Sequence, residues 1–363
     1  MKIKHIYIAC LLALTGCIET VPDCLPEVEV PVTFPSPVVE PAVKAAYGPL
    51  GTIYSTQESF GVFALYHQGA FNGWTSGSIY IDGAEFSYDA SINDSSEGSG
   101  AWISSPSYYW PNTGKMTFAA WSPYRAKDYS TSLSYGADGL TISGFHNSDE
   151  TGRQFDLMYS DRAIDRTKDS HAGTSTTYDG VDIVFHHALS AVIFQARSSI
   201  TTSKIRVSKI VLYDIVRSGD FSEHADETDP SVYSSSPSWT LSSDKYTEDS
   251  PLVVYSDNSV SESNVLPSDG ASSYPVGCVM PLPQDINAAK LKVYYTVQIG
   301  TSDPVPTVSQ PVDIGTSVVS GGSDVINSWQ MGKKYIYTLV LGAQKISFDV
   351  DLQTWQNADP QGI

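Results

Sequence analysis

Short apolar runs separated by turn residues recur along the whole chain, and a convincing long amphipathic helix is absent. The runs at 59–67, 77–89 and 114–124 combine aromatic and β-branched residues and are bounded by Gly, Asn, Asp or Pro. Further runs cover 180–197, 203–216, 251–256, 289–300, 333–342 and 345–355. Many short strands with this spacing favour packed sheets, so the sequence predicts an all-β fold built of β-sandwiches.

The segments between these runs are rich in Ser, Asp, Gly and Thr. We expect surface loops there, at 90–107, 146–179, 218–250, 257–275 and 301–327. A polar stretch near 198–203 divides the remaining chain into halves of similar size. The sequence therefore predicts two domains, 45–200 and 201–363.

Residues 1–16 have the composition of an export signal. Lys2 and Lys4 precede an apolar run, 6–14, that is too short to anchor the chain across a bilayer. The run ends in LTGC, which resembles a bacterial lipobox, and there the thiol of Cys17 accepts a diacylglyceryl group. The alternative is a plain secretory signal with a chance cysteine. We expect removal of 1–16 and a lipid on Cys17 that holds the protein on a membrane surface.

Acidic side chains outnumber basic ones by 40 to 21, which gives a formal net charge of -19 at pH 7. Such an exterior repels phosphates, which disfavours binding to nucleic acid and to anionic lipid head groups, and we predict no nucleic-acid partner. The 22 Tyr and 7 Trp suit a β-rich extracellular protein.

The sequence shows no pattern that is typical of an enzyme, cofactor or metal site. His186 and His187 are neighbours in a predicted strand, so their side chains point to opposite faces and cannot easily share a metal. The acidic loops 93–98, 147–152 and 224–229 lack EF-hand spacing and are expected to be solvated. No carboxylate pair stands out for glycoside hydrolysis. We predict no catalytic residues, no cofactor and no metal.

Two segments near opposite ends of the chain share one alternating pattern. In 27–35, EVEVPVTFP, one face would carry Val28, Val30, Val32 and Phe34. In 345–355 one face would carry Ile346, Phe348, Val350 and Leu352. Either segment could place four apolar side chains into the same kind of groove while hydrogen-bonding to a sheet edge.

Prolines and a lysine single out the first of these segments. Pro31 and Pro35 have equal parity, so their missing N–H donors lie along one edge, and we expect an edge strand whose outer side pairs with nothing. Lys44 follows in a Pro/Ala-rich linker and is the first basic residue after the signal. It is the only basic site there for a trypsin-like protease, or else a solvated linker lysine.

Cysteine is sparse. Cys10 lies in the signal and Cys17 in the lipobox, so only Cys24 and Cys278 are left to pair. An extracellular compartment permits a disulfide. The sequence leaves open whether these two residues form one.

Longer pieces of the chain occur in an order that a known family shares. The lipobox, short strand and linker are followed by FGVFALY, YYWPNTGKMTFAAWSPY, VDIVFHHALSAVIFQAR, KIRVSKIVLYDI and SWQMGKKYIYTLVLGAQKISFDVDLQTW. Together they cover nearly the whole mature chain. They resemble the fimbrillin (Mfa-like) family of Bacteroidetes outer-membrane lipoproteins, the subunits of type V pili.

The resemblance implies two tandem transthyretin-like β-sandwich domains and export to the outer membrane and cell surface as a lipoprotein. It further implies proteolytic removal of the first strand, whose groove then receives a strand from the next subunit. On this sequence Cys17 matches the lipidation site, 17–44 the removable strand with its linker, and Lys44 the processing position. Residues 345–355 match the C-terminal strands implicated in donation.

The leading hypothesis is therefore a non-enzymatic fimbrial stalk subunit, or a tip or accessory adhesin. Its partners would be other fimbrial subunits, the outer membrane before processing, and a ligand on a host or bacterial surface. The alternative is a surface glycan-binding outer-membrane lipoprotein, for which Tyr108, Tyr109 and Trp110 could form a stacking platform. Core packing explains Trp110 and Trp121 at least as well.

Overall fold

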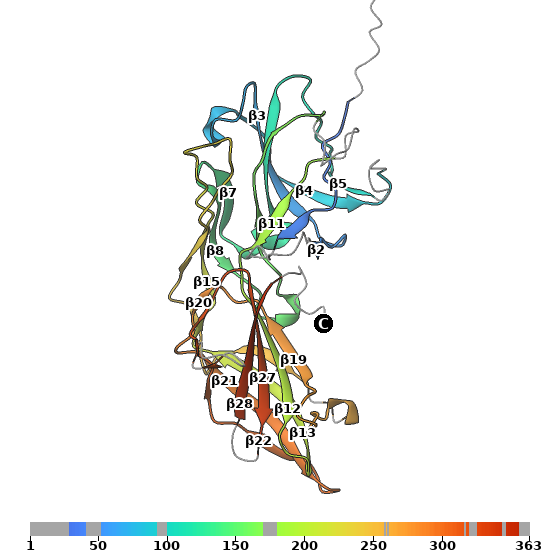
Figure 1. Cartoon of the computed structure of the whole chain (residues 1–363), viewed down its shortest axis with the longest axis vertical. Helices are drawn as coiled ribbons and strands as arrows, with labels where there is room; N and C mark the ends of the chain where they lie inside the picture. The colour runs from blue at the N-terminus through green and yellow to red at the C-terminus, as the bar shows by residue number, and fades with distance from the viewer. Residues whose placement is uncertain are drawn as a thin grey trace, which may run out of the picture.

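The computed structural model of the chain is elongated (Figure 1). It describes residues 29–40, 52–92, 100–169, 180–257, 259, 261–315, 317–318, 325–342 and 346–355. Cys17, Cys24, Val28 and Lys44 lie outside these ranges. The predictions made for those four residues therefore stay predictions.

The described part of the chain consists of strands β1 to β28 and four short 3-10 helices, which confirms the all-β prediction. The helices are η1 (Trp74–Ser76), η2 (Tyr124–Tyr129), η3 (Thr151–Arg153) and η4 (Glu262–Asn264). Among the described residues, no helix has both the length and the apolar character that a membrane crossing requires.

A nine-stranded sheet lies in the N-terminal half. In spatial order its strands are β2 (Thr52–Ile53), β1 (Val38–Glu40), β11 (Val184–His187), β9 (Met158–Ser160), β6 (Lys115–Ser122), β3 (Phe60–His67), β4 (Ser78–Asp89) and β5 (Ala101–Ser104), and β10 (Ala163–Arg166) also pairs with β6. Only β1 and β11 run parallel in this sheet.

The central strands of this sheet are buried on both faces, and β3 shows why. Its sequence FGVFALYH is apolar almost throughout, so alternate side chains supply two different cores. Phe60 and Val62 enter the N-terminal core, which also contains Phe118 and Phe185. The side chains of opposite parity, Phe63 and Leu65, enter the middle core, together with residues that include Trp121, Phe145 and Phe155.

A four-stranded sheet covers the other side of the middle core. It consists of β16 (Ser238–Leu241), β15 (Ser218–Ser222), β8 (Gly139–His146) and β7 (Ser132–Gly136). Leu140, Ile142 and Phe145 of β8 and Phe221 of β15 belong to that core together with Trp121. The middle core is thus a sandwich between two sheets.

Two further sheets enclose the C-terminal core. One contains β19 (Tyr274–Val279), β12 (Ala191–Ser198), β27 (Lys333–Leu341) and β28 (Ile346–Thr354). The other contains β18 (Leu252–Ser256), β13 (Ser203–Tyr213), β21 (Lys290–Ile299), β22 (Val305–Val308) and β23 (Val312–Asp313). Phe194, Ile210 and Tyr337 lie between them.

Three two-stranded pairings complete the fold. They are β14 (Ile215–Val216) with β17 (Lys245–Tyr246), β20 (Gln284–Asp285) with β26 (Ser328–Trp329), and β24 (Ser317–Val318) with β25 (Val325–Ile326).

Strand pairing crosses residue 200 in both directions. Strand β12 precedes it and pairs with β19 and β27 of the C-terminal half. Strand β15 follows it and pairs with β8 of the N-terminal half. Because pairing alone does not define folding units, the domain division at residue 200 stays a prediction.

Four of the five predicted loop segments contain strands. Strand β5 lies in 90–107, β9 and β10 in 146–179, β15 to β17 in 218–250, and β22 to β25 in 301–327. Most of these strands have two to five residues and are rich in Ser, Asp or Thr, so their own sequence gives little β signal. Several of them form because a longer neighbour offers a hydrogen-bonding edge, as β6 does for β10 and β21 does for β22 and β23.

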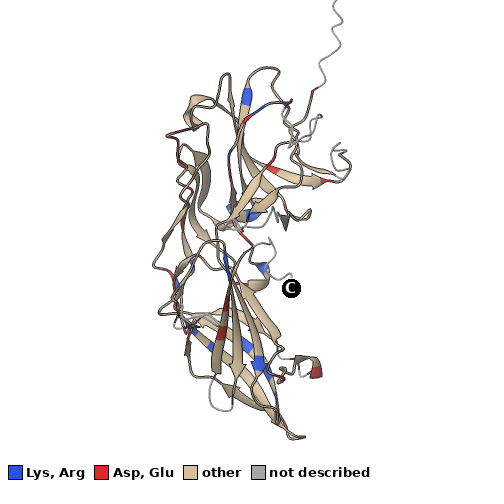
Figure 2. Ribbon diagram, viewed as in Figure 1, with Lys and Arg blue, Asp and Glu red and all other residues tan. Residues whose placement is uncertain are grey.

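Charged side chains of both signs are scattered over the two halves of the molecule (Figure 2). Two buried ones, Arg162 and Glu223, lie close to the middle core. The Arg162 guanidinium donates to Glu227 at 2.8 Å. The Glu223 carboxyl accepts from the Leu140 amide at 2.5 Å and from the Tyr233 hydroxyl.

Burial raises the pKa of Glu223 from 4.5 to about 7, although its two hydrogen bonds act in the opposite direction. The folded chain therefore holds this proton more tightly than the unfolded chain does. The stabilisation is fully present below pH 4.5 and is lost as pH rises through 7. A shift of this size corresponds to about 3 kcal/mol.

We predict that Glu223→Gln removes this pH dependence. The free energy of unfolding of the variant minus that of the unsubstituted chain should rise by about 3 kcal/mol between pH 4.5 and pH 8, as measured by urea unfolding. The exposed control Glu150→Gln should show no such rise. A Glu223→Gln difference that is the same at both pH values would contradict the assignment.

Candidate functional site

Residues 30–34 lie as an added strand against the β5 end of the nine-stranded sheet. The amides of Val32 and Phe34 donate to the carbonyls of Tyr108 (2.8 Å) and Trp102 (3.1 Å). In return, the carbonyls of Val30 and Phe34 accept from the amides of Trp110 and Trp102, both at 2.9 Å. The first half of the segment 29–40 therefore pairs antiparallel with the region 102–110 through the backbone groups of its even-numbered residues.

The opposite edge of the segment is also occupied. The Thr33 carbonyl accepts from the Val181 amide at 2.9 Å, and the Val38 amide donates to the Ile183 carbonyl at 3.0 Å. Strand β1 then lies between β11 and β2. The expectation that the outer side pairs with nothing is therefore wrong, because the segment bridges the β5 end and the β11 region of the sheet.

The prolines still lie where their missing donors matter least. In a strand, the amide positions of 31 and 35 share the edge of the Thr33 carbonyl, which faces Gly180 and Val181. Gly180 has a φ of +94°, and a Cβ on it would lie 2.7 Å from Cδ of Pro35. Only glycine fits this close approach.

Phe34 is the central apolar contact of the segment. Its ring meets three phenyl rings nearly edge to face, with centroid distances of 5.4 Å to Phe60, 5.0 Å to Phe86 and 5.7 Å to Phe118. Phe34 and Val32 are both 0% exposed. Such aromatic pairs each contribute about 0.5–1.5 kcal/mol beyond the area that they bury.

The buried face changes parity within the segment. Val30 is half-buried, Val32 and Phe34 are buried, Ser36 is exposed at a bend, and Val39 is again 0% exposed. We call the channel that residues 29–40 occupy the strand groove. The second half of the segment pairs in parallel with β11, and its first half pairs antiparallel with the region of β5.

The second alternating segment lies elsewhere. Strand β28 pairs antiparallel with β27 along all nine of its residues. Ile346 and Val350 are buried in the C-terminal core, Phe348 packs against that core, and Leu352 is 40% exposed. The structure therefore brings Val30, Val32 and Phe34 together in one core and places Ile346, Phe348 and Val350 in or against another.

Sequence reasoning missed much of the strand groove. Val39, Trp102, Val181 and Ile183 all line or fill it. Trp102 lies inside the predicted loop 90–107. The sequence signal for a buried strand there is the aromatic Trp102 between the apolar residues Ala101 and Ile103.

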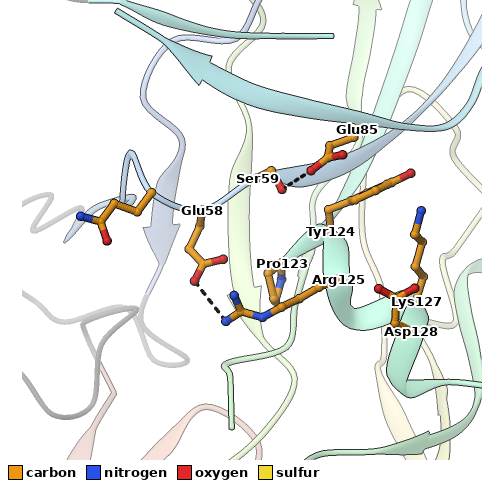
Figure 3. Close-up of a pocket in the computed structure, with 9 residues that line it drawn as sticks. Glu58, Ser59, Glu85, Pro123, Tyr124, Arg125, Lys127 and Asp128 are labelled. Carbon is orange, nitrogen blue, oxygen red and sulfur yellow. Dashed lines mark hydrogen bonds and ion pairs between the residues drawn. The ribbon is translucent and has the colours of Figure 1, made fainter. Parts of the chain in front are cut away.

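A separate polar pocket of about 480 Å³ lies at the start of β3 beside η2 (Figure 3). Arg125 lies 3.2 Å from the Glu58 carboxylate, and the Ser59 hydroxyl donates to Glu85 at 2.6 Å. Its lining consists of Gln57, Glu58, Ser59, Glu85, Pro123, Tyr124, Arg125, Lys127 and Asp128. Because Arg125, Glu58 and Glu85 already have partners in the pocket, it favours no particular ligand.

The aromatic cluster considered for glycan stacking is largely part of the core. Trp110 is 6% exposed and meets Phe118 edge to face at 5.6 Å, and Trp121 is 2% exposed in the middle core. The core interpretation of both residues is confirmed. Tyr109 and Tyr80 are 39% and 38% exposed.

The histidine pair behaves as its alternation predicts. His186 lies 2.7 Å from Asp161, and the buried His187 lies 2.7 Å from Asp156. Across the described ranges, no group of three or more His, Cys, Asp or Glu residues could hold a metal ion.

Comparison with known proteins identifies relatives of the fold. A family model described as fimbrillin-like matches residues 51–355. A crystallised fimbrial protein from Bacteroides vulgatus has 16% identity and a TM-score of 0.54, and the match covers 89% of this chain and 99% of that one. A putative cell adhesion protein from Bacteroides uniformis has 14% identity and a TM-score of 0.48, with coverages of 90% and 99%. No curated protein matches the chain.

We predict that Phe34→Ala lowers the free energy of unfolding of the intact chain by about 3–5 kcal/mol, because it leaves a cavity among three phenyl rings. Ser36, which is exposed in the same segment, provides a matched control. Ser36→Ala should change the free energy of unfolding by less than about 0.5 kcal/mol. Urea unfolding measures both. Equal effects of the two substitutions would show that Phe34 does not hold the segment in place.

Proposed function

The chain belongs to the fimbrillin-like family, and we propose that it is a fimbrial subunit that assembles by strand exchange at the strand groove. In this proposal residues 29–40 fill the groove until the chain is cut, and a strand from another subunit then replaces them. The role is structural or adhesive, as a stalk subunit or as a tip or accessory adhesin, and involves no catalysis.

One observation carries the proposal. Residues 29–40 are hydrogen-bonded on both edges and place Phe34 at the centre of the N-terminal core, yet they precede the family match at residue 51. Their removal would leave the amide of Trp102 and the carbonyls of Trp102 and Tyr108 unpaired beside an apolar channel. Unpaired backbone groups and exposed apolar surface both favour the entry of a new strand.

Export and anchoring form the second part of the proposal. Cys17 would carry the lipid that holds the precursor in the outer membrane at the cell surface, and Lys44 would be the site of cleavage. The main alternative, a glycan-binding lipoprotein, loses support because its candidate platform residue Trp110 is buried against Phe118.

We expect Lys44→Ala to keep the exported protein at full length and to prevent its assembly, because no other lysine or arginine lies between Cys17 and Lys115. The exposed lysine variant Lys127→Ala serves as the control and should be trimmed normally. Intact-mass spectrometry of surface-extracted protein reports both. Assembled material whose N-terminus is still the lipidated Cys17 would refute the processing step.

A second variant tests the anchor. Cys17→Ser should abolish the lipid-dependent mass increase and move the precursor out of the membrane fraction, since serine offers no thiol. Cys10→Ser lies within the signal and should leave both properties unchanged. Retention of the Cys17→Ser protein in the membrane fraction would count against lipidation at this position.

A further inference from the structure

We propose that the strand groove selects its incoming strand by side-chain size at three positions, and that this strand comes from a different subunit and not from β28 of a second copy. The three positions are those that Val32, Phe34 and Val39 occupy, at offsets of 0, +2 and +7. The proposal rests on the strand exchange proposed above and specifies its partner.

The offsets follow from the two halves of the groove. Val32 and Phe34 share parity, whereas Val39 has the opposite parity, and the exposed Ser36 lies at the change. The first half is positioned by Trp102 and Tyr108, and the second by parallel pairing with β11. A strand with uninterrupted alternation cannot fill both halves, because one of them would receive its polar face.

The sizes follow from the packing. The Phe34 position is surrounded by the rings of Phe60, Phe86 and Phe118, so a smaller side chain leaves a cavity. Val32 and Val39 are each 0% exposed, so a much larger side chain there overpacks the core. The groove therefore fits a small β-branched residue, an aromatic residue two positions later, and a small β-branched residue five positions after that.

Strand β28 has the right spacing and the wrong sizes. One register places Phe348, Val350 and Trp355 at the three positions, which inverts large and small side chains at each of them. Moving Phe348 to the Phe34 position brings Gln353 to the Val39 position. A third register, with Leu352 at the Phe34 position, places Asn357 at the Val39 position. Both of these registers bury an amide in an apolar site.

Strand β28 is also held in its own subunit. Just beyond its last residue, Trp355 is 1% exposed and stacks on His187, with ring centroids 4.0 Å apart and an interplanar angle of 8°. Trp355 belongs to the middle core, whereas Val350 belongs to the C-terminal core. Asp349 also forms a 2.6 Å ion pair with Arg197 of β12. Withdrawal of β28 would open both cores of the donor.

The test uses the chain without its signal, with a cleavage site for a sequence-specific protease engineered into residues 41–50. After cleavage, fluorescent peptides compete for the groove, and anisotropy measures their binding. The peptide of residues 29–40 and its control Ser36→Ala should bind equally well. The Phe34→Ala peptide, a peptide lacking Ser36, and the peptide of residues 346–355 should each bind at least about tenfold more weakly.

A size-swapped peptide makes the test specific. The 346–355 peptide with Phe348→Val, Val350→Phe and Trp355→Val should recover most of the affinity of the 29–40 peptide. Equal binding of the unaltered 346–355 peptide, or no recovery in the swapped one, would overturn this inference and leave strand exchange intact. Failure of every peptide, including 29–40 itself, would overturn the proposed function and this inference together.

Discussion

The two-sided pairing of residues 29–40 is the constraint on which the N-terminal half depends. This segment joins two regions of one nine-stranded sheet that would otherwise end beside an apolar channel, and Phe34 places its ring among those of Phe60, Phe86 and Phe118. Strand pairing and core packing therefore rely on the same twelve-residue piece of chain. Loss of that piece affects both at once, which is why a replacement strand would be strongly favoured.

The middle core ties the two halves of the molecule together. It receives Trp121 from the N-terminal sheet, Phe221 from β15, and Trp355 from the end of β28. Trp355 stacks on His187, which itself contacts the buried Asp156. The C-terminal strand is thus part of the packing between the halves, so its two ends serve different cores.

Sequence reasoning succeeded where a segment carries its own pattern. The strands at 60–67, 78–89, 115–122 and 333–341 were predicted within one or two residues, because each has enough β-branched and aromatic residues to show its pattern. The burial of Val32 and Phe34 followed from alternation alone. The short strands β9, β15 and β22 escaped prediction, since each has only three to five residues and so shows little pattern of its own.

By itself, the sequence determined that this chain is all-β and that two segments near its ends share an alternating apolar face, and its first residues predict export as a lipoprotein. Only the tertiary structure decided that these faces enter different cores, that both edges of residues 29–40 are paired, and that Val39, Trp102 and Val181 complete the groove. The reason is physical. Alternation specifies which side chains share a face, whereas the identity of the neighbouring strand depends on contacts between residues far apart in the chain.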